Sequence, residues 1–197
     1  DRFIVDDNKI EPEPIQRELV GLSSTHMRWI QTDSSEWSES ACIEAVLTFP
    51  LQNSKNEESV TYPDVVILAE TTSSGLSIVK GLGARGIKVR HTFGTGDPDA
   101  RVTKEAVQRQ KVGFFLGAEQ VKATTIHSFK GWESTCLVIQ LTANSETNSA
   151  AAAYTALTRL KASEHGEDSF ITVVCSDPRY SSYGQTWPSF ERWPKSK

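Results

Sequence analysis

The run Asp64-Val-Val-Ile-Leu-Ala69 decides the fold class, because it is apolar without the alternation of a half-buried strand. A strand buried on both faces of a parallel sheet has this pattern. Other strand-like runs cover residues 26–30, 87–90, 121–126, 137–141 and 170–175. The sequence therefore predicts a sheet with helices on both faces.

Helix-forming segments separate these runs. They cover residues 34–47, 74–84 and 150–160, and a further helix is expected to start at Asp97-Pro98, where Asp would cap and Pro would take the first helical position. Strands alternating with helices predict a doubly wound, mostly parallel α/β fold over residues 25–176. We expect residues 1–24 to be an extended lead-in and residues 177–197 an irregular tail whose aromatic side chains pack back.

One glycine motif is set aside. Gly81-Leu-Gly-Ala-Arg-Gly86 spells the dinucleotide-binding fingerprint, which works only after a strand and at the start of a helix. Here it falls at the end of a predicted helix and before a strand. The glycines are therefore expected to end the helix and turn the chain.

Composition narrows the class of protein. The net charge of −4 is unlike that of a nucleic-acid binder with a broad basic face, although a narrow phosphate-contacting edge remains compatible with it. The three cysteines form no Cys-x-x-Cys pair and the four histidines are scattered, so we expect free thiols and no metal site. Apolar runs are short and no secretory signal is recognisable, so a cytoplasmic protein without a membrane partner is expected.

The segment Ala123-Thr-Thr-Ile-His-Ser-Phe-Lys-Gly-Trp-Glu133 runs from a predicted strand into a polar turn. Ligands of α/β folds meet loops at the carboxyl ends of strands. Glu133 is a carboxylate suited to sugar hydroxyls. The groups that could donate hydrogen bonds to phosphate oxygens belong to Thr124, Thr125, His127 and Ser128. An ordinary strand-to-helix loop with a capping serine explains this segment equally well.

A second segment, Tyr154-Thr-Ala-Leu-Thr-Arg-Leu-Lys161, is predicted to lie on a helix with Arg159 and Lys161 near its carboxyl end. These cations could simply complement the helix dipole. Alternatively, Arg159 could reach a γ-phosphate across a domain interface, since its charge is permanent and its fork matches phosphate oxygens.

In this order and at this spacing, the two segments resemble motifs V and VI of superfamily 1 helicases of the UvrD/Rep type. The resemblance covers roughly residues 25–175 and implies a RecA-like domain. It implies that Glu133 meets the ribose of ATP and that Arg159 is the catalytic arginine at its γ-phosphate, while Lys130 and Gly131 shape this ATP-binding loop. It also implies that the single-stranded DNA path is lined by Thr124, Thr125, His127 and Ser128.

The chain departs from the family pattern in three places. Trp132 stands where the family usually has leucine, and the family's motif IV, with its nucleotide-contacting arginine, is not recognisable. Only about 26 residues separate Gly94 from Val121, where many relatives insert an accessory domain.

The sequence contains no Gly-x-x-x-x-Gly-Lys-[Ser/Thr] phosphate loop. The resemblance therefore implies half of a motor, the C-terminal RecA-like domain of an ATP-dependent DNA helicase or translocase. Its partners would be single-stranded DNA and an N-terminal RecA-like domain of the same protein, which would hold Mg²⁺ and the phosphates of ATP. The alternative is a degenerate RecA-like module that binds a partner or nucleic acid without ATPase activity.

Overall fold

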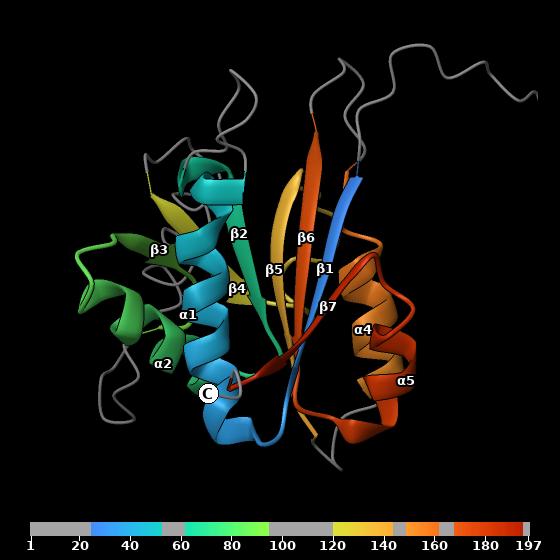
Figure 1. The fold of residues 1–197 in the computed structure, drawn as a ribbon. Coiled ribbons are helices and arrows are strands. Elements are labelled where there is room, and N and C mark those ends of the chain that lie inside the picture. Colours follow the sequence, from blue (N-terminus) through green and yellow to red (C-terminus); the bar gives the residue numbers. More distant parts are fainter. Residues whose placement is uncertain (1–24, 53–61, 95–119, 144–148, 162–167, 195–197) are drawn as a thin grey trace, which may run out of the picture.

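The computed structural model describes residues 25–52, 62–94, 120–143, 149–161 and 168–194. Within these residues a single sheet has the strand order β3-β4-β2-β5-β6-β1-β7, and every neighbouring pair is parallel (Figure 1). The strands are β1 (Thr25–Thr32), β2 (Val65–Ala69), β3 (Val89–His91), β4 (Val121–Thr125), β5 (Cys136–Leu141), β6 (Ser169–Cys175) and β7 (Ser189–Trp193). The predicted parallel α/β sheet is confirmed.

Helices cover both faces of the sheet. One face carries α1 (Ser35–Gln52) and α2 (Thr72–Gly83), and the other carries α4 (Ser149–Leu157) and α5 (Ser181–Gly184) (Figure 1). Short 3-10 turns precede β2 and α5, as η1 (Tyr62–Asp64) and η2 (Pro178–Tyr180). The doubly wound arrangement predicted from the sequence is therefore present.

The central strands explain the continuous apolar runs. Along β2 every residue is buried, but alternate side chains belong to different cores: Ile67 packs beneath α1 and α2, and Leu68 packs on the α4 side. The same division holds in β5, where Val138 and Ile139 face opposite layers. Burial on both faces removes the polar alternation of a half-buried strand.

Two element boundaries differ from the prediction. Helix α1 continues to Gln52, and the buried Phe49, 1% exposed, anchors its last turns in the core. Helix α4 ends at Leu157, so Arg159 and Lys161 lie beyond the helix and not on it. The lead-in and the helix expected at Asp97-Pro98 lie outside the described residues.

The prediction of an irregular tail was wrong. After Asp177 the chain forms η2, α5 and then β7, which pairs in parallel with β1. Trp187 was correctly expected to pack back; it is 6% exposed and lies edge-on to Trp29, with 5.2 Å between ring centroids. The aromatic residues of this segment complete the sheet and its second core.

The glycine motif ends α2, as predicted. Gly86 has a φ of +78°, and the amide of Ile87 donates to the carbonyl of Leu82 at 3.1 Å. This is the left-handed helix termination that glycine favours. The motif lies between α2 and β3, and so it does not follow a strand or open a helix as the dinucleotide fingerprint must.

Two glycines of α2 provide a matched test of packing. A Cβ at Gly75 would stand 2.2 Å from Cζ of the buried Phe93, whereas a Cβ at Gly83 would meet nothing within 4 Å. We expect Gly75→Ala to destabilise the fold by roughly 1–3 kcal/mol through overpacking. Gly83→Ala should stabilise it by up to about 1 kcal/mol. Urea unfolding measures both, and equal stabilisation by the two variants would contradict the packing described here.

Candidate functional site

The segment between β4 and β5 crosses the sheet from the side on which the parallel strands end to the side on which they begin. These sides are called the carboxyl edge and the amino edge. It leaves Thr125 at the carboxyl end of β4, and it enters β5 at Cys136, which pairs with the first residues of β2 and β6. Ile126 and Phe129, 4% and 2% exposed, fix the crossing segment to the core on the α4 side. The predicted site residues are consequently divided between the two edges of the sheet.

At the carboxyl edge, hydroxyl groups hold the start of the crossing segment. The Thr125 hydroxyl accepts from the Ser128 amide at 3.1 Å and donates to Ser128 Oγ at 2.9 Å. Both His127 and Ser128 are exposed. Thr124 differs, because it is only 2% exposed and its Oγ1 lies 2.6 Å from that of Thr92. Thr124 therefore ties β4 to the end of β3 and does not present its side chain to solvent.

At the amino edge, backbone hydrogen bonds place Glu133 beside Arg159. The amide of Ser134 donates to the Arg159 carbonyl at 3.0 Å, and the amide of Lys161 donates to the Ser134 carbonyl at 2.9 Å. Ser134 and Leu160 form an isolated parallel bridge. Glu133 directly precedes this bridge and is exposed. The two segments that the sequence analysis singled out thus meet at one place.

The Arg159 side chain folds back on the end of α4. Its Nε donates to the Thr155 carbonyl at 3.2 Å, and its Nη2 donates to Thr158 Oγ1 at 3.1 Å. These contacts satisfy terminal groups of the helix, as expected of a cation that complements the helix dipole. The side chain is half-buried, so part of the guanidinium also faces solvent.

Lys130 and Gly131 lie on the exposed part of the crossing segment. Gly131 has a φ of +88°, and a Cβ built there would meet nothing within 4 Å. The backbone conformation, not a lack of space, therefore explains the glycine. This turn directs the chain from Phe129 towards Glu133.

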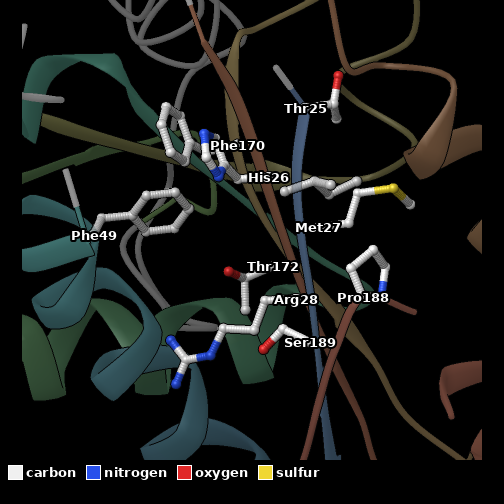
Figure 2. Close-up of a pocket in the computed structure, with 10 residues that line it drawn as sticks. Thr25, His26, Met27, Arg28, Phe49, Phe170, Thr172, Pro188 and Ser189 are labelled. Carbon is white, nitrogen blue, oxygen red and sulfur yellow. The ribbon is translucent and has the colours of Figure 1, made fainter. Parts of the chain in front are cut away.

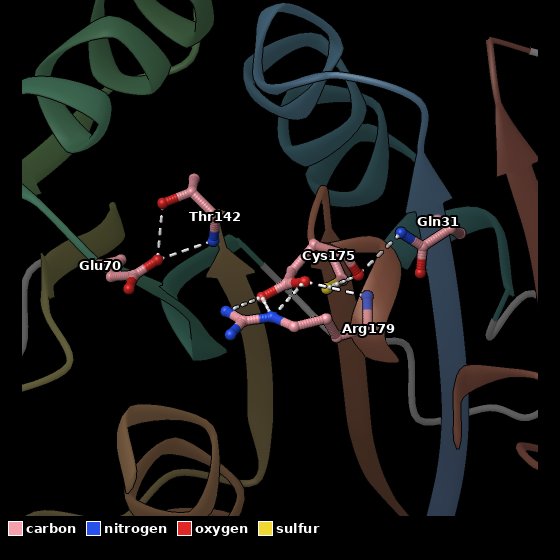
Figure 3. A network of polar contacts seen from close by, with 6 residues as sticks. Gln31, Glu70, Thr142, Cys175 and Arg179 are labelled. Atoms are coloured by element: carbon pink, nitrogen blue, oxygen red, sulfur yellow. Dashed lines mark hydrogen bonds and ion pairs between the residues drawn. The ribbon is translucent and has the colours of Figure 1, made fainter. Parts of the chain in front are cut away.

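A polar network at the carboxyl ends of β1 and β6 was missed by the sequence analysis (Figure 3). The carboxylate of Asp177, 1% exposed as a residue, accepts from the Arg179 amide at 2.9 Å and from its guanidinium at 2.6–3.0 Å. Hydrogen bonding to Arg179 lowers the pKa of Asp177, and the same pairing raises the pKa of Arg179. The signal was present as Asp177-Pro178, a capping residue followed by proline.

A second carboxylate joins β2 to β5 at this edge. One oxygen of Glu70, Oε2, accepts from both the amide and the hydroxyl of Thr142, each at 2.7 Å (Figure 3). The neighbouring strands β5 and β6 end level with each other, because Leu141 pairs with Cys175. Glu70, Thr142 and the Asp177–Arg179 pair thus share one edge.

Burial shifts the pKa of three further groups. It raises the pKa of the Cys175 thiol to about 12, raises that of Cys42 and lowers the pKa of His91. All three cysteines are buried and free, as predicted. Among the described residues, no group of three metal-ligating side chains is found, and no helix is long and apolar enough to cross a membrane.

A pocket of about 350 Å³ opens at the amino ends of β1 and β6 (Figure 2). The His26 ring stacks on Phe170 with 4.6 Å between centroids, and its Nε2 lies 2.9 Å from Asp168 Oδ2. None of the residues that the sequence analysis selected lines this pocket.

The sequence matches no protein-family model, and no curated protein matches it. Several solved structures are similar to the chain, including the three that follow. The C-terminal domain of a possible DNA helicase from Lactobacillus plantarum WCFS1 is 16% identical, with a TM-score of 0.44 over 78% of this chain and 75% of that one. The C-terminal part of the Fun30 ATPase domain is 10% identical, with a TM-score of 0.45 over 80% and 48%.

The third similar structure is domain 2 of the DEAD-box helicase Mss116p bound to an RNA duplex, 15% identical, with a TM-score of 0.48 over 87% of this chain and 65% of that one. The chain therefore spans about half to three quarters of the length of these structures. All three TM-scores are below 0.5.

Asp177 predicts a pH dependence of stability. Its folded pKa is lowered, so its stabilising contribution is complete above the pKa of the unfolded chain, about 4, and is lost as pH falls through the folded value. We expect Asp177→Asn to lower the urea midpoint at pH 7 and to flatten the loss of stability below about pH 4.

The matched control is Asp33→Asn. The Asp33 side chain is 69% exposed, and its Oδ1 makes only a long contact of 3.9 Å with Arg192 Nη1. Urea midpoints measured across pH should change far less in this variant. An equal change of pH dependence in both variants would contradict the assignment to Asp177.

Proposed function

We propose that the chain is the C-terminal RecA-like domain of a cytoplasmic, ATP-dependent DNA helicase or translocase of the superfamily 1 UvrD/Rep type. The observation that carries this proposal is the pair of backbone hydrogen bonds by which Ser134 joins residues 159 and 161. They bring the segment that ends at Glu133 against the segment that contains Arg159. The two motif-like sequences are therefore neighbours in space as well as in order.

The amino edge is proposed to be the nucleotide side. The exposed Glu133 carboxylate can accept hydrogen bonds from ribose hydroxyls, and the permanently charged guanidinium of Arg159 suits a γ-phosphate. Arg159 must exchange its contacts with Thr155 and Thr158 for the phosphate, and these are single hydrogen bonds to neutral acceptors. Charge-assisted bonds to phosphate are stronger than neutral ones, so this exchange is favourable.

ATP with Mg²⁺ supplies the transferable phosphoryl group when it is bound between this domain and an N-terminal RecA-like domain that carries the phosphate loop. The residues of this chain then orient the ribose and stabilise charge on the γ-phosphate. The chain alone has no phosphate loop and is not expected to hydrolyse ATP.

The carboxyl edge is proposed to be the nucleic-acid side. His127 and Ser128 present an imidazole and a hydroxyl group there, and such groups donate to phosphate oxygens. The hydroxyl of Thr125 donates to Ser128 Oγ and so positions Ser128 at this edge. Thr124 holds this edge in place through Thr92. Residues 126–135 connect both edges and are anchored by Ile126 and Phe129. This crossing segment is therefore the proposed mechanical link between the nucleotide and the DNA strand.

The alternative proposal is a RecA-like module that binds a partner or nucleic acid without ATPase activity. The bonds from Arg159 to Thr155 and Thr158 favour it, because they account for the arginine as a charge at the end of α4. The two proposals differ in what the loss of Arg159 should do.

In the protein that combines this chain with a phosphate-loop domain, we expect Arg159→Ala to lower ATP turnover by roughly 10³–10⁵-fold. Binding of ATP should change little, because the arginine acts mainly on charge that develops during transfer. Arg159→Lys should also lower ATP turnover, because the lysine ammonium is a point charge and does not reproduce the forked geometry of the guanidinium. Steady-state ATPase assays and nucleotide titrations measure the two effects.

The matched control is Arg85→Ala. Arg85 Nη1 donates to the Gly81 carbonyl four residues earlier at 3.1 Å, as Arg159 Nε does to Thr155. Turnover should survive this substitution. Near-normal DNA-stimulated ATPase activity in a folded Arg159→Ala variant would support the alternative.

The isolated chain should bind single-stranded DNA weakly, and its binding should be sensitive to salt with a shallow slope. Its net charge is −4, so few phosphates can be neutralised, and each contact contributes about 0.7 to the slope of log affinity against log salt. A fluorescence titration with a single-stranded oligonucleotide tests this expectation. Tight, sequence-specific binding at physiological salt would instead favour the stand-alone binding module.

A further inference from the structure

One exposed guanidinium at the carboxyl edge is fixed by a buried carboxylate. The side chain of Asp177 is 2% exposed, whereas that of Arg179 is 67% exposed. Both the backbone and the side chain of Arg179 bind the Asp177 carboxylate. The Arg179 amide donates to Oδ1 at 2.9 Å, and Nη2 donates to Oδ2 at 2.6 Å. The pair is neutral overall, but its negative end points into the protein and its positive end towards solvent.

The backbone of Asp177 is also held, by residues of β1 and β6. The carbonyl of Asp177 accepts from Gln31 Nε2 at 3.3 Å and from Cys175 Sγ at 3.6 Å. Gln31 in turn accepts from the indole of the buried Trp29 at 3.1 Å. Figure 3 shows Gln31 on one side of this network and the Arg179 guanidinium on the other, towards Glu70 and Thr142. The exposed arginine therefore has its orientation set before any ligand arrives, which lowers the entropic cost of binding.

Arg179 shares an edge with the proposed nucleic-acid residues. It follows β6, and Thr125, His127 and Ser128 lie at the end of β4, with β2 and β5 between. Three strand spacings of about 4.8 Å separate the two places by roughly 14 Å. A single strand that runs along the carboxyl edge can reach both, because every strand of the sheet ends on that side.

An acidic group lies between these two places, and it bears on the charge of the edge. Glu70 follows β2, and its Oε2 is occupied by the amide and hydroxyl of Thr142. Its charge still opposes a phosphate. An outward guanidinium beyond it offsets that repulsion and gives the phosphate backbone a favourable contact on the far side.

We propose that Arg179 binds a phosphate of the single-stranded nucleic acid that passes Thr125, His127 and Ser128. This inference rests on the proposed function and extends the strand's path across β2 and β5 to the end of β6. Arg179 acts as a preorganised phosphate contact and reads no base. The Asp177 carboxylate and the Gln31 amide act as positioning groups behind it.

The test is a fluorescence anisotropy titration of the full chain with a labelled oligodeoxythymidine at several salt concentrations. We expect Arg179→Gln to weaken binding about threefold or more and to reduce the salt slope by about 0.7, the contribution of one phosphate contact. Arg179→Lys keeps a cation for Asp177, so it should keep the slope and bind less tightly than the parent chain.

The matched control is Arg85→Gln, which makes the same charge change at the end of α2, on the amino side of the sheet. It should leave affinity and slope unchanged. The inference is overturned if both Arg179 variants bind like the parent chain while His127→Ala and Ser128→Ala weaken binding, a result that leaves the proposed function intact. Absence of binding by the parent chain at low salt would overturn the nucleic-acid role itself.

Discussion

The amino edge depends on the two backbone hydrogen bonds of Ser134, one from its amide to the Arg159 carbonyl and one to its carbonyl from Lys161. Backbone bonds of this kind do not depend on side-chain identity, so they fix the position of the chain and leave the side chains available for chemistry. Without them, the exposed Glu133 and the half-buried Arg159 would be two unrelated polar residues 26 positions apart in the sequence. With them, a carboxylate and a guanidinium share one edge.

The opposite edge is organised by side chains. The Thr92–Thr124 pair and the Glu70–Thr142 pair each hold the carboxyl ends of neighbouring strands together, and the Asp177–Arg179 pair fixes the turn that follows β6. A polar group buried without a partner costs free energy, so these pairings also stabilise the sheet. The segment between Thr125 and Cys136 joins the two edges through the buried Ile126 and Phe129. One short, packed segment thus connects the two edges.

The sequence predicted the sheet because the β2 and β5 runs record burial on both faces. It missed features that depend on tertiary packing. Nothing local shows that Phe129 is buried and draws the chain across the sheet. The loop of the segment 123–133 was therefore expected at the carboxyl ends of the strands, whereas Glu133 lies near their amino ends. Likewise, β7 forms because the side of β1 that faces away from β6 is open to pairing. Residues 189–193 alone do not indicate this.

We propose that nucleotide and nucleic acid use opposite edges of the sheet. The most direct measurement is a pair of amide NMR titrations of the isotope-labelled chain, one with Mg²⁺-ATP and one with single-stranded DNA. We expect the nucleotide to shift the amides of Ser134 and of residues 159–161. DNA should shift those of residues 125–128 and of Ser176, Asp177 and Arg179. Shifts confined to the same edge for both ligands would contradict the account.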